Sequence, residues 1–109
     1  MSKVSKVKVV YANWCPHCVP TTVEPMKEVA REIGAELELL DIDVAGERAD
    51  EVVREHGDWC ADYIIPQVFF EYTDGTVKHV MSGYSESVDM TKRAIANLRK
   101  STFYRKASS

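Results

Sequence analysis

The sequence predicts an α/β protein with one four-stranded mixed sheet and helices on both faces. Strand and helix signals alternate along the 109 residues in the order βαβαββα. The second strand pattern, residues 36–43, has apolar side chains on both of its faces, which is typical of a strand covered by helices on either side. Two later strand patterns are separated by Asp74 and Gly75, a strong hairpin signal. We therefore expect one parallel pair and one antiparallel hairpin in a single sheet.

The first strand and the first helix are predicted by a change in hydrophobic period. Residues 6–12 alternate as a strand, and Val10 helps to cover the face opposite the main apolar one. A helical pattern follows over residues 15–33, with Gly34 as its expected stop. Pro25 should kink this helix because proline cannot donate to the carbonyl four residues earlier. The inward faces are Val7, Val9 and Tyr11 on the strand and Val19, Val23, Met26, Ala30 and Ile33 on the helix.

The rest of the chain supplies two further helices and the hairpin. Residues 46–56 read as a short helix that buries one apolar face and ends at Gly57. Residues 67–72 and 76–81 read as the hairpin strands. Ser85 or Ser87 can cap a last helix that extends to about residue 101. The expected inward residues are Ala49, Val52 and Val53 on the short helix and Val88, Thr91, Ile95 and Leu98 on the last one.

The length of 109 residues predicts one domain over residues 1–109, with a core at about 5–100 and a tail at about 102–109. A net charge of −3 gives no indication of a nucleic-acid partner. Residues 1–6 lack the apolar stretch of a signal peptide, and no segment has the apolar length of a membrane span. Three cysteines do not suggest a structural disulfide framework, so we expect a cytoplasmic protein. We also expect a monomer that has no membrane partner.

The stretch Trp14-Cys15-Pro16-His17-Cys18 has the pattern of a redox site. Proline is favoured at the first position of a helix, so Pro16 places Cys15 at the N-cap. Unpaired N–H groups and the helix dipole favour a thiolate there. Cys18 follows at helical i,i+3 spacing, which is close enough for a disulfide after small adjustments. We expect Cys15 as the nucleophile, Cys18 as its partner and His17 as a tuning residue, with this disulfide in place of any other cofactor.

The order of elements, this motif after the first strand, and Ile65-Pro66 before the third resemble the thioredoxin superfamily. The resemblance covers about residues 5–100, in the minimal, glutaredoxin-like layout. It implies a protein disulfide oxidoreductase that takes electrons from a thioredoxin reductase or from glutathione. It also implies that the Ile65–Pro66 bond is cis and lies beside the dithiol, and that the neighbouring backbone pairs with the substrate. Gly83 matches the glycine that leaves the substrate groove open, and Trp14 would shield the thiols with an exposed ring.

Several positions depart from the known branches of this family. Thioredoxins usually have a buried aspartate where Val9 stands, and their lysine partner corresponds roughly to Leu39. Glutaredoxins often have a basic residue just before the motif, where this chain has Ala12 and Asn13. The Pro-His dipeptide is that of the strongly oxidising periplasmic enzyme, but the inserted helical domain of that enzyme is missing. The subfamily is therefore open.

Other interpretations of the cysteines remain open at this point. Cys15 and Cys18 could form a zinc site with His56 and Cys60, although the two pairs are farther apart than in a usual zinc finger. The chain could also be a thioredoxin-fold module that binds a metal or a partner without turnover, or a glutathione-dependent reductase. A lone cysteine such as Cys60 is most often a buried small hydrophobe. Under oxidising conditions it could instead pair with a partner or a second copy. We interpret His56 and His79 as structural or surface residues.

Overall fold

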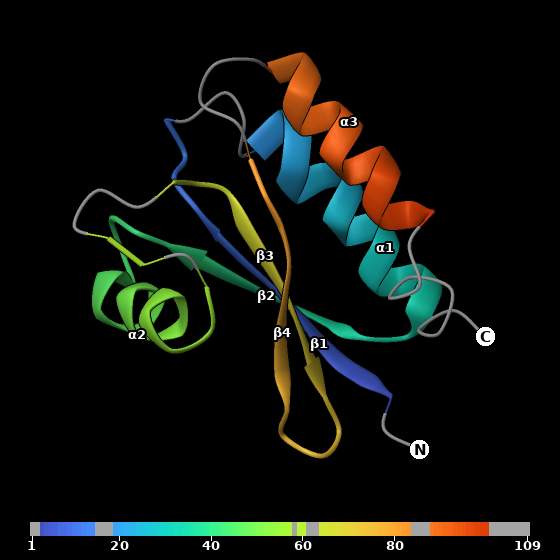
Figure 1. Ribbon diagram of the computed structural model, residues 1–109, viewed down its shortest axis with the longest axis horizontal. Helices are drawn as coiled ribbons and strands as arrows, with labels where there is room; N and C mark the ends of the chain where they lie inside the picture. The colour runs from blue at the N-terminus through green and yellow to red at the C-terminus, as the bar shows by residue number, and fades with distance from the viewer. Residues whose placement is uncertain (1–2, 15–18, 58, 61–63, 84–87, 101–109) are drawn as a thin grey trace.

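A mixed β-sheet forms the centre of the structure, a computed structural model that describes residues 3–14, 19–57, 59–60, 64–83 and 88–100. The strands are β1 (Val4–Tyr11), β2 (Glu36–Asp41), β3 (Gln67–Tyr72) and β4 (Val77–Ser82), and the helices are η1 (Val19–Val23), α1 (Glu24–Ile33), α2 (Gly46–His56) and α3 (Val88–Arg99). The strand order is β2-β1-β3-β4; β1 is parallel to β2 and antiparallel to β3, and β3 is antiparallel to β4 (Figure 1). The prediction of an α/β protein with a four-stranded mixed sheet is confirmed.

The central strand β1 contributes to a hydrophobic cluster on each face of the sheet. Val7 and Val9 belong to the larger cluster, together with residues of α1 and α3. Val10 belongs to a second cluster with Leu40 and Phe69, to which α2 contributes. In Figure 1, α1 and α3 lie together on one side of the strands and α2 lies on the other. The alternation in β1 therefore directs buried side chains to opposite faces.

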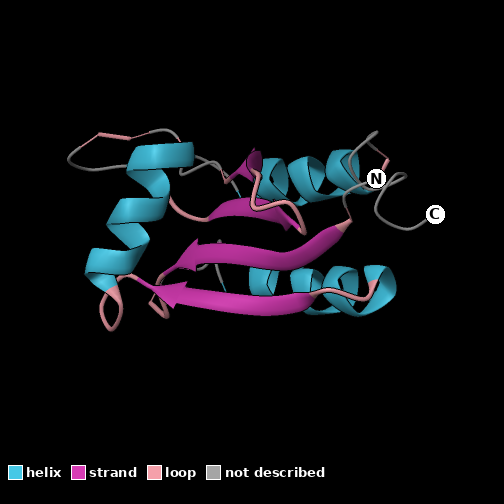
Figure 2. Ribbon diagram, turned by 90° about the horizontal axis from the view of Figure 1, so that it is seen from below, coloured by secondary structure: helices cyan, strands magenta, loops and turns pink. Residues whose placement is uncertain are grey.

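Beside α2, the sheet carries a cluster of charged side chains. Figure 2 shows α2 crossing the strand direction at one end of the sheet. On the same face, Lys8 is 7% exposed and its Nζ lies 3.0 Å from Glu71 Oε1. Glu38 contacts Lys6 at 3.6 Å and Arg48 at 2.8 Å. Burial raises the pKa of Glu38, but the hydrogen bond from Arg48 and nearby positive charges lower it overall. This small contribution to stability is present at neutral pH and is lost as the pH falls through that lowered pKa.

The first helical region differs from the prediction of one kinked helix. Its described part begins with the π-helix η1 and continues as α1 from Glu24, and the predicted start at residues 15–18 lies outside the described residues. Pro25 lies in the first turn of α1, directly after the π-helical turn of η1. Proline has no N–H to donate to the preceding turn, and the break in α-helical hydrogen bonding falls there, at the change from η1 to α1. Gly34 ends α1 with φ of 71°, as expected for a left-handed cap.

Two strand ends also differ from their predictions. β2 ends at Asp41 instead of residue 43, because the Asp41 carboxylate accepts the N–H of Asp43 and the chain turns. The strand was expected to be covered by helices on both faces, but its Leu39 is 38% exposed. The hairpin connection covers residues 73–76, and within it the positive φ is at Gly75 and not at Asp74. Asp74 instead accepts the N–H of Thr76 at 2.9 Å.

The two remaining helices follow the predicted pattern closely. The bounds of α2 are those predicted, and its three inward residues are buried. Thr91, Ile95 and Leu98 of α3 are buried as well. The proposed caps Ser85 and Ser87 and the tail from residue 102 lie outside the described residues.

Candidate functional site

The candidate site lies at the sheet edge where β1 and β2 end and β3 begins. Open α/β sheets bind ligands at the carboxyl ends of their parallel strands, outside the sheet. Cys15, Pro16, His17 and Cys18 lie outside the described residues. Trp14 and Val19, which flank them in the sequence, are described, as are Ile65, Pro66 and Gly83. The surroundings of the motif can therefore be followed from its neighbours in the chain.

Ile65 and Pro66 lie next to the end of β1. The β1–β3 register pairs Val10 with Gln67, which puts Pro66 beside the last residue of β1. Ala12 is fully buried and packs against Ile65. The Ile65–Pro66 peptide bond is cis, as the resemblance led us to expect. Ala12, three positions before Cys15 in the sequence, thus contacts the loop that leads into β3.

Gly83, at the end of β4, lies directly against Pro66. Its N–H donates a hydrogen bond to the Pro66 carbonyl at 2.7 Å. A Cβ at Gly83 would overlap Pro66 Cδ and would lie 3.0 Å from Cγ and 3.1 Å from the backbone nitrogen. Glycine at this position therefore allows the end of β4 to approach Pro66 closely.

Gln67 holds the loop before β3, a role that the sequence pattern did not indicate. Its side chain is fully buried, and its Nε2 donates to the Ile64 carbonyl at 2.8 Å. A Cβ at Gly57 would overlap Gln67 Oε1 and would come within 2.8 Å of Phe69 Cζ. The absence of a side chain at Gly57 therefore makes room for Gln67. A buried amide needs such a partner, because an unpaired polar group is costly in the interior.

Asn13 and Trp14 are linked to the loop after β2 by a second group of contacts missed from the sequence. Asn13 Nδ2 donates to Asp41 Oδ2 at 2.6 Å, and Trp14 Nε1 donates to Asp43 Oδ2 at 2.9 Å. Trp14 is 68% exposed, as expected for its ring, whereas Asp41 is buried. A signal was present in the sequence: Asp41 ends the strand that pairs in parallel with β1, and Asp43 follows it by two residues. Parallel strands end at the same sheet edge, so their last residues are neighbours.

The remaining candidate residues lie apart from this edge or have local partners. Cys60 is exposed, which corrects the interpretation of a buried small hydrophobe. His56 lies 3.6 Å from the Glu55 carboxylate. His79 bonds the Met81 carbonyl and stacks on Phe69 at 5.1 Å, which supports a structural role. Within the described part of the chain, no three His, Cys, Asp or Glu side chains are grouped as for a metal ion.

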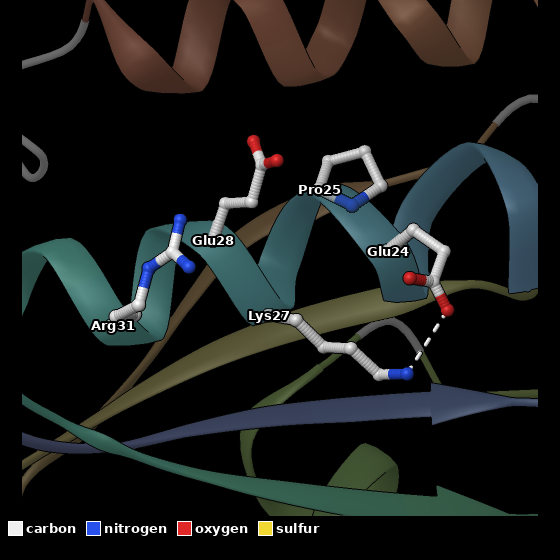
Figure 3. A pocket seen from close by; sticks show the side chains of 5 residues that line it. All are labelled: Glu24, Pro25, Lys27, Glu28 and Arg31. Carbon is white, nitrogen blue, oxygen red and sulfur yellow. Dashed lines mark hydrogen bonds and ion pairs between the residues drawn. The ribbon is translucent and has the colours of Figure 1, made fainter.

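A surface hollow of about 410 Å³ lies along α1 (Figure 3). Its described lining is Glu24, Pro25, Lys27, Glu28 and Arg31, all from this one helix. Lys27 pairs with Glu24 at 2.9 Å, and both side chains are more than half exposed. The hollow brings together no residues of the candidate site, so we assign it no function.

The described residues contain no helix that is both long enough and apolar enough to cross a membrane. No protein-family model, curated protein or solved structure matches this chain.

Proposed function

We propose that this protein is a thiol–disulfide oxidoreductase with a thioredoxin-like fold, and that it exchanges a Cys15–Cys18 dithiol with disulfides in other proteins. The single observation that carries the proposal is the position of the motif in the chain. The Cys-Pro-His-Cys sequence stands between β1 and the helical segment η1, and β1 ends at the sheet edge that also carries Pro66 and Gly83. A dithiol between a strand and a helix suits this chemistry because a helix start favours the thiolate.

The reaction needs two unequal sulfurs. The Cys15 thiolate attacks one sulfur of a substrate disulfide, forms a mixed disulfide, and releases the other substrate sulfur as a thiolate. The Cys18 thiolate then attacks Cys15 Sγ, which closes the Cys15–Cys18 disulfide and releases the second substrate sulfur. Two electrons pass from the protein to the substrate. A thioredoxin reductase or glutathione would return two electrons and restore the dithiol.

Turnover decides between this proposal and a binding module. Purified protein is mixed with a protein disulfide and either glutathione with its reductase or a thioredoxin reductase, and NADPH consumption is followed. Catalytic consumption with one donor supports the oxidoreductase and identifies the branch. Binding of the same protein disulfide without consumption by either donor would identify a non-catalytic module.

We expect His17→Ala to lower the reduction potential of the Cys15–Cys18 pair by a few tens of millivolts. An imidazole between the cysteines stabilises the Cys15 thiolate, and each pKa unit corresponds to about 1.4 kcal/mol, or roughly 30 mV for two electrons. The variant should also raise the Cys15 pKa. Thiolate absorbance against pH and equilibration with glutathione measure the two quantities.

An apolar floor beneath the thiols would oppose the His17 effect by desolvation. Val9 is fully buried but Leu39 is 38% exposed, so we expect the His17 effect to outweigh this contribution at Cys15. A Cys15 titration that is unchanged in His17→Ala would mean that the helix terminus alone sets the potential.

A further inference from the structure

Asp41 joins the segment before the dithiol to the loop that follows β2. It is the last residue of β2 and is 7% exposed. Its Oδ2 accepts a hydrogen bond from Asn13 Nδ2 at 2.6 Å, and its Oδ1 accepts the backbone N–H of Asp43 at 2.8 Å. Both oxygens of one buried carboxylate are therefore used, one by each segment.

Of the two hydrogen bonds that Asp41 accepts, one stabilises a local turn and the other joins distant segments of the chain. The bond to the Asp43 N–H spans two residues and is a common way to turn the chain after a strand. The bond from Asn13 spans 28 residues and is not needed for that turn. Asn13 is exposed, so water could satisfy its amide. It is bonded to a charged acceptor instead, and such bonds are roughly twice as strong as neutral ones.

Asp43 carries the connection on to Trp14. Its Oδ2 accepts the indole N–H of Trp14 at 2.9 Å. The ring of Trp14 is 68% exposed, so packing does little to fix its direction. Asp41 thus bonds both the residue before Trp14 and the turn that carries Asp43, the acceptor of the indole N–H.

We propose that Asp41 is a positioning residue of the dithiol site, which orients the indole of Trp14 for docking of a protein disulfide. This inference rests on the proposed function. Asp41 acts through Asn13 and Asp43 and does not itself contact the substrate. Loss of the link should therefore raise KM for a protein disulfide and leave kcat nearly unchanged, because the sulfur chemistry belongs to Cys15 and Cys18.

Exchanging the two partners tests this link. Asn13→Asp places two carboxylates opposite each other and breaks the bond. Adding Asp41→Asn restores a donor–acceptor pair in the reverse direction, while the new amide oxygen can still accept the Asp43 N–H. The variants are made in a Trp59→Phe background, which leaves Trp14 as the only indole of a chain with two tryptophans. The ¹H–¹⁵N signal of this indole and its exchange with water report its orientation without any enzymatic reaction.

We expect Asn13→Asp to shift the indole signal, speed its exchange, and raise KM for a protein disulfide about three- to tenfold, as loss of one such hydrogen bond would. The double variant should recover both the signal and KM. An indole signal that is unchanged in Asn13→Asp, or not recovered in a folded double variant, would overturn the role of Asp41. So would a fall in kcat with KM unchanged. If the parent protein turns over no disulfide, the proposed function fails, and the indole signals still decide whether Asp41 orients Trp14.

Discussion

Cys18→Ser is expected to accumulate a stable mixed disulfide with an oxidised protein substrate, whereas Cys15→Ser forms none. Cys15 makes the first attack, so its loss stops the reaction before any covalent complex exists. Loss of Cys18 removes the sulfur that would resolve the complex. Turnover should fall to background in both variants, because the exchange needs both sulfurs. Non-reducing gel electrophoresis and mass spectrometry of the trapped species measure the outcome.

Cys60 provides the control for this experiment. It is an exposed free thiol and would form adducts of its own, so the variants are made in a Cys60→Ser background. That background should keep most of the dithiol activity, because the exchange closes with two sulfurs. Near-complete loss of activity in folded Cys60→Ser would assign a role to the third cysteine. Complexes trapped by Cys15→Ser and not by Cys18→Ser would reverse the order of attack.

Gly83→Ala is expected to reduce the free energy of unfolding by about 1–3 kcal/mol, the usual cost of overpacking a filled site. The new Cβ would meet the ring and the backbone nitrogen of Pro66, and neither can move as the end of a flexible side chain can. Any movement of Pro66 passes to the loop against which Ala12 packs. Disulfide turnover should therefore fall as well, by about tenfold or more, because small misplacements near reacting atoms are costly.

Gly46→Ala is the matched control, because a Cβ at Gly46 meets nothing within 4 Å. Gly46 begins α2, where alanine fits the helical backbone, so this variant should gain up to about 1 kcal/mol and keep its activity. Urea unfolding and turnover of a protein disulfide are measured for both. Equal stability and activity of the two variants would mean that the close contact between Gly83 and Pro66 affects neither folding nor disulfide turnover.

The sequence predicted the regular elements well where one strong local signal determined them. The helix bounds at residues 46–56 follow from the spacing of Ala49, Val52 and Val53 together with Gly57. The left-handed end of α1 follows from Gly34. In contrast, Pro25 predicted a kink within one helix, and the sequence did not indicate the change from the π-helix η1 to α1 just before it. Proline marks a break in α-helical hydrogen bonding, but its missing N–H does not specify which form the break takes.

The candidate site was only partly predictable, because its positioning contacts join residues far apart in the chain. Pro66 and Gly83 were found through a resemblance, but their mutual hydrogen bond was not. Gln67 and Asp41 read as ordinary strand residues, and their roles depend on Ile64 and Asn13, which the sheet register brings to them. The end of a strand parallel to β1 indicates that Asp41 and Asn13 are neighbours, but not that Asn13 instead of water will bond the carboxylate.

The place of β1 in the sheet has a consequence for synthesis on the ribosome. β1 emerges before the other three strands of this sheet, yet one of its two neighbours, β3, begins only at Gln67. Until then a nascent chain that has formed β1, α1 and β2 exposes one unpaired edge of an apolar central strand. Such an edge can pair with another unfinished chain. Chains truncated before residue 64 and released from the ribosome should therefore associate, whereas the full chain, in which β3 pairs with β1 and α3 covers the sheet, should not.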